Sequence, residues 1–189
     1  YHGADPEGII LVGHSNGGFM AHRMACERGD MIRAAISLAG ATYYDFDDCQ
    51  NTGNPNILQI HGTLDSVIQY DGGTLFGGSY PSAPQTVNYW ANRSECDTSL
   101  TLIDELDIIS PSGQNDTIEY EYLNCNSGNR VSLWKIPDGG HLPAVSSASG
   151  DDFAETILNW GLTGYFPDSD GDGFRDDVDD FPHDPLENQ

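Results

Sequence analysis

The sequence predicts an α/β fold, a mostly parallel sheet with helices on both faces, followed by a short acidic tail. Two observations support this prediction. Short apolar runs of strand length alternate with amphipathic stretches of helix length, and past Gly164 the composition changes to Asp, Gly and Pro. A boundary there divides the 189 residues into a body over 1–164 and a tail over 165–189. The body is long enough to enclose a hydrophobic core.

The first half of the body carries three apolar runs, at 9–12, 34–39 and 57–60, which are typical of parallel strands covered on both faces. A helix over 19–27 follows the first run. A second helix is expected after Ser82, which can cap its first turn. Pro84 then lies in that turn, and Val87, Trp90 and Ala91 fall on one face.

In the second half of the body, the sequence predicts two strands over 100–109 and 117–123 that form an excursion from the alternating pattern of strands and helices. A turn-rich segment at 110–113 separates them. A further strand is expected at 131–136. The last helix is expected over 151–162, with Phe153, Ile157 and Trp160 on its inner face.

The charge of the chain excludes some classes of partner. Thirty Asp and Glu against seven Lys and Arg give a net charge of −23, and a polyanion is repelled by nucleic acid and by anionic membranes. No apolar run approaches the ~18 residues needed to span a bilayer. We therefore expect neither nucleic acid nor a membrane as a partner.

The stretch Gly13-His14-Ser15-Asn16-Gly17 fits the pattern G-x-S-x-G between an apolar strand and an amphipathic helix. That context is typical of a nucleophile elbow, a sharp turn that exposes the serine hydroxyl. We expect both glycines because a Cβ atom at either position would collide with the neighbouring strand and helix. Ser15 is therefore the candidate nucleophile. The backbone N–H of Asn16, at the helix start, is the candidate oxyanion donor.

A serine nucleophile needs a base, and the base needs an orienting acid, in the chain order Ser, Asp or Glu, His. Asp65 follows the third predicted strand, and His141 follows the strand at 131–136. Functional groups gather at the carboxyl ends of parallel strands, so these residues are expected to meet Ser15 there. Asp71 and Asp138 are weaker rivals for the acid.

The remaining histidines of the body are assigned lesser roles. His14 flanks the nucleophile and is expected to line the substrate pocket or to pack beside it. His22 is expected on the helix surface or behind the site. His61 and Gly62 precede the acid loop, so we interpret this pair as positioning that loop.

These motifs resemble secreted α/β-hydrolase esterases of the polyhydroxybutyrate depolymerase and feruloyl esterase type. The matching stretches are 13–18, 60–73, Trp90 with Cys96 and Cys125, and 139–143. The resemblance covers residues 1 to about 163 and implies nucleophile Ser15, acid Asp65 and base His141. It departs from the family at Leu142, where an aromatic residue is usual.

The resemblance implies that this chain is the C-terminal half of an α/β-hydrolase fold. Members of that family carry several strands and helices before the elbow, including the loop that donates the second oxyanion N–H. That half is missing from this sequence, so we expect the chemistry to belong to a longer protein.

Four cysteines form an even set without C-x-x-C spacing, which argues against a zinc site and leaves three possible disulfide pairings. The resemblance favours Cys26–Cys49 and Cys96–Cys125. Such bridges imply an oxidising compartment, extracellular or periplasmic; the alternative is four free thiols in a cytosolic enzyme.

The tail contains a calcium-loop pattern, with carboxylates at loop positions 1, 3, 5, 9 and 12 and glycine at position 6. Its candidate ligands are Asp168, Asp170, Asp172, Asp176 and Asp179. Position 12 is not the Glu of an EF-hand, and the segment looks like a thrombospondin type 3 repeat. We expect a structural calcium ion there, the alternative being a disordered acidic tail.

The leading prediction is a secreted carboxylic-ester hydrolase that uses a Ser-His-Asp triad and no catalytic cofactor. Its ester substrate would be a polyhydroxyalkanoate, a feruloylated or acetylated polysaccharide, or a smaller ester. A serine peptidase of the prolyl-oligopeptidase type and a non-catalytic calcium-dependent binding module are the alternatives. The oligomeric state is left open. The aromatic residues proposed to line a cleft are Tyr43, Tyr44, Phe76, Tyr80 and Trp90, with Trp90 and His14 as candidates for substrate contact.

Overall fold

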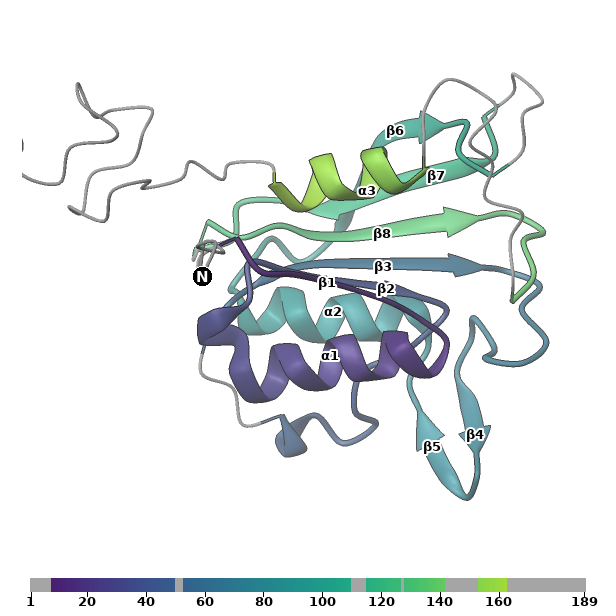
Figure 1. The fold of residues 1–189 in the computed structure, drawn as a ribbon, viewed down its shortest axis with the longest axis horizontal. Coiled ribbons are helices and arrows are strands. Elements are labelled where there is room, and N and C mark those ends of the chain that lie inside the picture. Colours follow the sequence, from purple (N-terminus) through teal and green to yellow (C-terminus); the bar gives the residue numbers. More distant parts are fainter. Residues whose placement is uncertain (1–7, 50–52, 110–114, 127, 142–152, 163–189) are drawn as a thin grey trace, which may run out of the picture.

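The structure is a computed structural model that describes residues 8–49, 53–109, 115–126, 128–141 and 153–162 (Figure 1). The described part contains a mixed sheet, a small hairpin, α-helices and short 3-10 turns. In chain order the elements are β1 (Ile10–His14), α1 (Asn16–Arg28), η1 (Gly29–Met31), β2 (Ala34–Leu38), η2 (Phe46–Asp48), β3 (Asn56–Gly62), β4 (Gly73–Leu75), β5 (Gly78–Tyr80), α2 (Ala83–Arg93), β6 (Leu100–Leu106), β7 (Thr117–Tyr122), β8 (Val131–Ile136) and α3 (Phe153–Leu162).

The main sheet has the strand order β1-β2-β3-β8-β7-β6. The strands β1, β2, β3 and β8 are parallel, whereas β7 and β6 continue the sheet as antiparallel strands. The strand pair expected as an excursion thus extends the same sheet. The carboxyl ends of β1, β3 and β8 open onto one edge, where parallel α/β sheets place their functional groups.

Helices cover both faces of the sheet, as the sequence predicts: α1 and α2 lie on one face and α3 lies on the other (Figure 1). Alternate residues of a strand pack in the two different layers, because successive side chains of a strand point to opposite faces of the sheet. Ala35, Ile57 and Leu133 pack with α1 and α2. Ile36, Leu58 and Ile60 pack with Ile157 and Trp160 of α3.

Strand β1 departs from the expectation of a strand covered on both faces. It lies at an edge of the described sheet, and Val12 is 53% exposed. The strands β2 and β3, which have neighbours on both sides, are buried along nearly all of their length. The prediction therefore holds for these two strands. In β1, Leu11 packs in the layer of α1 and α2 and Ile10 packs in the layer of α3, so Val12 is the residue that departs from it.

The second helix begins as predicted. The Ser82 hydroxyl accepts from the Gln85 N–H at 3.1 Å, and Gln85 Oε1 accepts from the Ser82 N–H at 3.0 Å, which forms a capping box. The helix α1 also has one buried face. It is formed by Ala21, His22 and Ala25, whereas Met20 is half exposed.

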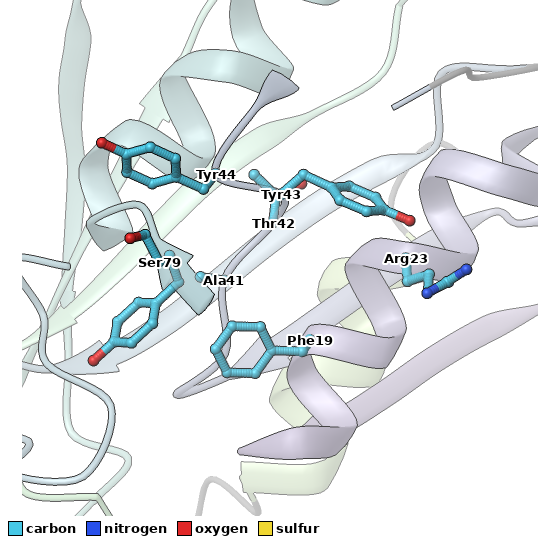
Figure 2. Close-up of a pocket in the computed structure, with 8 residues that line it drawn as sticks. Phe19, Arg23, Ala41, Thr42, Tyr43, Tyr44 and Ser79 are labelled. Carbon is cyan, nitrogen blue, oxygen red and sulfur yellow. The ribbon is translucent and has the colours of Figure 1, made fainter. Parts of the chain in front are cut away.

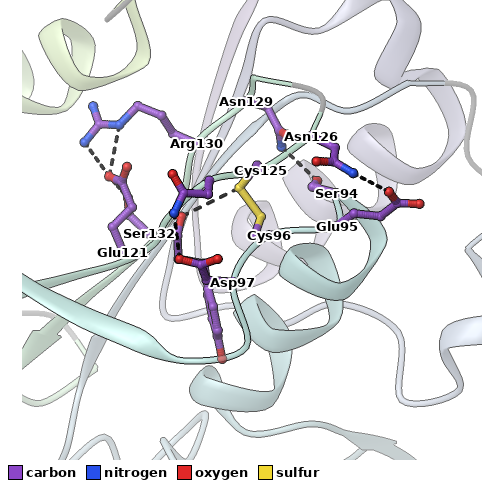
Figure 3. The surroundings of a disulfide bond; sticks show 12 residues. Ser94, Glu95, Cys96, Asp97, Glu121, Cys125, Asn126, Asn129, Arg130 and Ser132 are labelled. Carbon is purple, nitrogen blue, oxygen red and sulfur yellow. Dashed lines mark hydrogen bonds and ion pairs between the residues drawn. A yellow bond between two sulfur atoms is a disulfide. The ribbon is translucent and has the colours of Figure 1, made fainter.

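Two disulfides, Cys26–Cys49 and Cys96–Cys125, join the elements in the pairing that the family resemblance implies. Figure 3 shows the second bridge and its polar surroundings, where Asn129 Nδ2 donates to Ser94 Oγ at 3.0 Å. The bridge thereby fastens the end of α2 to the loop between β7 and β8. None of the helices in the described ranges is long and apolar enough to cross a membrane.

Candidate active site

Ser15 occupies a strained turn between β1 and α1. Its φ of 55° and ψ of −118° lie in a region that residues with a side chain seldom adopt. The Ser15 N–H donates to the Leu38 carbonyl oxygen at 2.8 Å, and the Ser15 carbonyl oxygen accepts from the N–H groups of Gly18 and Phe19. These bonds hold the turn that the G-x-S-x-G pattern predicts.

The two glycines of this pattern have different roles. A Cβ atom at Gly13 would overlap the backbone of Gly17, so only glycine fits there. A Cβ atom at Gly17 would meet nothing within 4 Å. The expectation of a collision at both positions is therefore wrong for Gly17, whose backbone is the obstacle rather than the group that needs space.

His141 bridges the serine and the acid. Its Nε2 lies 3.0 Å from Ser15 Oγ, and its Nδ1 lies 2.8 Å from Asp65 Oδ2. With the imidazole proton on Nδ1, the ring donates to Asp65 and accepts the hydroxyl hydrogen of Ser15. Three residues from the loops after β1, β3 and β8 thus form one hydrogen-bonded chain, which is the geometry of an activated serine nucleophile.

The loops that carry Asp65 and His141 are fastened to each other. The N–H of Leu64 donates to the Gly139 carbonyl oxygen at 2.9 Å, and the N–H of Asp138 donates to Thr63 Oγ1 at 2.8 Å. A Cβ atom at Gly62 would overlap the Gly139 backbone, so this close approach requires glycine. The parallel pairing of β3 with β8 therefore sets the spacing between acid and base.

The Asp65 carboxylate is buried but well satisfied. Its Oδ1 accepts from the N–H groups of Val67 at 2.8 Å and Ile68 at 2.9 Å. Burial by itself would raise the pKa of Asp65, but hydrogen bonds from His141, Val67 and Ile68 outweigh that effect and lower the pKa. The acid therefore stays ionised at neutral pH. Asp71 and Asp138, the rival candidates, are not hydrogen-bonded to His141 in the described contacts.

His14 contacts the candidate base rather than the cavity. Its Nε2 lies 2.7 Å from the His141 carbonyl oxygen, and the two imidazole rings are 4.8 Å apart. It is absent from the lining of the two cavities described below. Of the two roles expected for His14, packing beside the site is the one that these contacts favour.

A cavity of about 510 Å³ opens beside Ser15. Its walls are mostly apolar and come from the start of α1, the acid loop and the β4–β5 hairpin. The lining residues are Ser15, Asn16, Phe19, Val67, Ile68, Leu75, Phe76, Gly78, Ser79 and Tyr80. Asn16 is the first residue of α1, and a first-turn N–H has no acceptor within its own helix. The cavity thus joins the candidate nucleophile and the candidate oxyanion donor.

A second cavity of about 240 Å³ adjoins the first and shares Phe19, Ser79 and Tyr80 with it. Figure 2 shows Tyr43 and Tyr44 on the segment after β2, with the Tyr43 ring directed toward Arg23 of α1. Four of the five aromatic residues that the sequence proposed for a cleft line one or both cavities.

Trp90, the fifth, does not line either cavity. Its side chain is 0% exposed and its Nε1 donates to His22 Nδ1 at 3.2 Å, inside the layer between α2 and the sheet. The expectation that Trp90 contacts substrate is therefore wrong. His22 is likewise fully buried, and burial lowers its pKa to about 4, outweighing a hydrogen bond with Gln59. Of the two positions expected for His22, the helix surface is therefore wrong.

Sequence reasoning missed two contributors to this region. The β4–β5 hairpin was not predicted, although glycine pairs at 72–73 and 77–78 flank its short apolar run. The sequence indicates Gln59 of β3 only as part of a strand. The buried face of α1 offers the missed signal for His22, because Gly18, Ala21 and Ala25 recur around it at helical spacing.

The candidate calcium ligands at 168–179 lie outside the described residues, and so does Leu142, so the calcium site stays a prediction. Within the described ranges, no group of three or more His, Cys, Asp or Glu side chains is arranged to hold a metal ion.

An α/β sheet that brings a serine, a histidine and an aspartate together at its carboxyl edge has the form of a serine-dependent hydrolase. No family model matches the sequence. Feruloyl esterase B from Piromyces equi is 30% identical over 145 residues, which cover 72% of this chain and 25% of that protein. The protein named "Putative esterase NocK" from Nocardia uniformis subsp. tsuyamanensis is 28% identical over 148 residues, 72% of this chain and 42% of that protein.

This chain thus spans less than half the length of either curated relative. The two similarities support an esterase-type protein. They leave the substrate and the roles of individual residues to be inferred from the site itself.

Proposed function

We propose that this protein is a carboxylic-ester hydrolase whose nucleophile is Ser15, with His141 as the base and Asp65 as the orienting acid. One observation carries the proposal. The continuous hydrogen-bond chain from Ser15 Oγ through His141 to Asp65 borders an apolar cavity of about 510 Å³. The two esterase relatives support the same class of reaction.

In the proposed reaction, Ser15 Oγ attacks the ester carbonyl carbon while His141 Nε2 takes the hydroxyl proton. Asp65 keeps the His141 proton on Nδ1 and stabilises the imidazolium. The Asn16 N–H stabilises the oxyanion of the tetrahedral intermediate. His141 then protonates the leaving alcohol. In the second half of the reaction His141 takes a proton from a water molecule, the water attacks the acyl-enzyme, and His141 returns the proton to Ser15 Oγ.

The proposed substrate is an ester with an apolar or aromatic group, because phenylalanine, isoleucine, leucine and tyrosine side chains line the cavity. Feruloylated or acetylated polysaccharides and polyhydroxyalkanoates fall within that class, and the Piromyces relative is named for feruloyl esters. The two disulfides support an extracellular or periplasmic location, since such bridges persist in oxidising compartments.

The test is hydrolysis of p-nitrophenyl butyrate and of methyl ferulate by the intact protein and its Ser15→Ala variant. We expect the variant to lose roughly 10⁴-fold or more in kcat, because the covalent route is removed. Ser94→Ala is the matched control, since Ser94 is buried at the far end of α2, where its contacts within the described residues are with Asn129 and with backbone groups.

Activity retained in Ser15→Ala, or absent from the folded wild-type protein on both esters, would overturn the proposal. In the second case, cleavage of peptide substrates distinguishes a peptidase from a non-catalytic protein.

A further inference from the structure

A hydrogen-bonded row of four buried polar side chains lies between the helices α1 and α2 and strand β3. It runs from Trp90 in α2 through His22 in α1 to Gln59 and His61, two residues apart on β3. Each of these side chains belongs to a residue that is at most 1% exposed. Polar groups this deeply enclosed are stable only when hydrogen bonds satisfy them.

The bonds along this row are continuous. Trp90 Nε1 lies 3.2 Å from His22 Nδ1, and His22 Nε2 lies 2.8 Å from Gln59 Oε1. Gln59 Nε2 lies 3.0 Å from the Gly40 carbonyl oxygen and 3.1 Å from His61 Nδ1. Two helices and the segment after β2 are thereby connected to β3 through one network.

The Trp90 indole, at one end of this row, fixes the donor and the acceptor of every hydrogen bond that follows. The indole N–H of Trp90 can only donate, so His22 must accept at Nδ1 and carry its proton on Nε2. That proton is donated to Gln59 Oε1, which leaves the Gln59 NH₂ group to donate to His61 Nδ1. His61 must therefore also carry its proton on Nε2. Both imidazoles are neutral in this arrangement, since a proton on either Nδ1 would face another donor.

His61, at the other end of this row of side chains, contacts the loop that carries Asp65. The N–H at His61 Nε2 donates to the Ile68 carbonyl oxygen at 2.8 Å, and Asp65 Oδ2 lies 3.4 Å from the same nitrogen. The N–H of Ile68 donates in turn to Asp65 Oδ1 at 2.9 Å. The Tyr70 ring meets the His61 ring edge-on at 5.7 Å. His61 thus fixes the turn on which the Asp65 carboxylate depends.

We propose that His61 is a positioning residue for Asp65, and that Trp90, His22 and Gln59 fix the tautomer and orientation of His61. The kinetic part of this inference rests on the proposed esterase function, whereas the structural part does not. His61 acts without touching substrate: its Nε2–H donor keeps the carboxylate aligned with His141 Nδ1.

The kinetic test compares His61→Leu with His61→Gln in the intact protein. Leucine removes the donor, and we expect kcat to fall roughly 10²-fold with KM changed less than about twofold, because a small misplacement of the acid disturbs proton transfer and not binding. The amide nitrogen of glutamine reaches nearly as far as Nε2, so we expect His61→Gln to recover most of kcat.

Val87→Ala is the matched control, because Val87 lies fully buried in the same core as Trp90. Its truncation lowers stability without removing a hydrogen bond of the network, and kcat should stay at the wild-type value. A His61→Leu variant that folds and keeps wild-type kcat would overturn the proposal. So would equal losses of kcat in the leucine and glutamine variants.

The second test needs no catalytic activity. Nitrogen NMR of ¹⁵N-labelled protein reports which ring nitrogen of each histidine carries the proton, and we expect Nε2 for both His22 and His61. In Gln59→Glu the carboxylate can only accept, so the His61 proton should move to Nδ1. The resonance of the proton between His141 and Asp65 should then shift or broaden.

An Nδ1 proton on either histidine in the wild-type protein would overturn the proposal. The same holds if His61 changes tautomer in Gln59→Glu while the proton between His141 and Asp65 is unaffected. If the wild-type protein hydrolyses no ester, the proposed function fails, but these NMR outcomes still decide whether His61 positions Asp65.

Discussion

At the scale of single residues, the acid of the candidate triad is oriented by backbone groups. Oδ1 of Asp65 accepts from two N–H groups, of Val67 and Ile68, which leaves Oδ2 facing His141 Nδ1. The two oxygens therefore have separate partners and are not interchangeable. This division determines what an amide at position 65 would do.

For Asp65→Asn we expect the amide oxygen to take the two backbone N–H groups, so that the NH₂ group faces His141 Nδ1. His141 must then carry its proton on Nε2, where it cannot accept the Ser15 hydrogen. We expect kcat on p-nitrophenyl butyrate to fall roughly 10³–10⁴-fold at pH 7 while the fold is kept. A loss below tenfold in folded protein would contradict the assigned role.

His22 is a buried titratable group that the proposed reaction does not use directly. Its pKa falls to about 4 because burial disfavours the charged ring. The unfolded chain takes up a proton near the ordinary pKa of about 6.5, whereas the folded protein does so only near 4. Burial of the neutral His22 ring therefore costs no free energy of unfolding above pH 6.5. As the pH falls from 6.5 toward 4, protonation of the unfolded chain lowers the free energy of unfolding.

We expect the free energy of unfolding in urea to fall by about 3 kcal/mol more between pH 7.5 and 4 in the wild-type protein than in His22→Gln. Glutamine can bond within the network but does not titrate. All other titratable side chains are the same in both proteins, so the difference reports the loss of the His22 ring. Parallel pH profiles for the two proteins would contradict a neutral, buried His22.

At the scale of elements, the β4–β5 hairpin shapes the substrate cavity without supporting the core. Only three residues pair in each of its strands, and Phe76 at its turn is fully exposed. Tyr80, at its end, is buried, and its hydroxyl accepts from the Gln69 N–H at 2.9 Å. The hairpin base is thus fixed to the acid-loop region, while its tip presents an aromatic ring to the cavity.

Phe76→Ala should leave the free energy of unfolding unchanged within about 0.5 kcal/mol, since no buried surface is lost. We expect KM for p-nitrophenyl butyrate to rise about threefold to tenfold, because the ring no longer shields the ester from water. Leu102→Ala is the control, as Leu102 is an exposed apolar residue on the distant edge strand β6. An unchanged KM in Phe76→Ala would remove the ring from the binding surface.

At the scale of the whole molecule, the charge is strongly unbalanced. The net charge is −23, and Arg130, which packs over the Trp160 ring, is already paired with Glu119 and Glu121. Repulsion among the remaining carboxylates opposes compaction, and mobile ions screen it. The edge strand β6 carries Asp104 and Glu105, charges that also discourage pairing with another chain.

Raising NaCl from 20 to 500 mM should therefore increase the melting temperature, by about 2–4 °C for each kcal/mol of repulsion screened. The measurement is calorimetry in EDTA, so that calcium binding to the predicted tail site does not contribute. The melting temperatures in sodium sulfate and in sodium chloride should be compared at equal ionic strength. A melting temperature that falls with salt would show that attractive ion pairs outweigh the net repulsion.

Local sequence patterns were enough to predict most elements and the three candidate triad residues. Ser15 stands out because strand, glycine turn and helix are adjacent in the chain, and Asp65 and His141 each directly follow a strand. The hairpin escaped prediction because three-residue strands leave almost no periodic signal. The hydrogen-bond partners of His22 and Gln59 escaped it because a lone polar residue in a buried element does not reveal its partner.

The sequence by itself determined the alternation of elements, the strained turn at Ser15 and the order of the candidate triad, because each depends on neighbours within a few residues. Only the tertiary structure decided that β8 pairs with β3, which brings Gly62 against Gly139 and Asp65 within 2.8 Å of His141. It also decided that Trp90 is joined to His61 through the core and not to substrate. Such contacts link residues far apart in the chain, and their geometry arises only when the packed layers fix position and direction together.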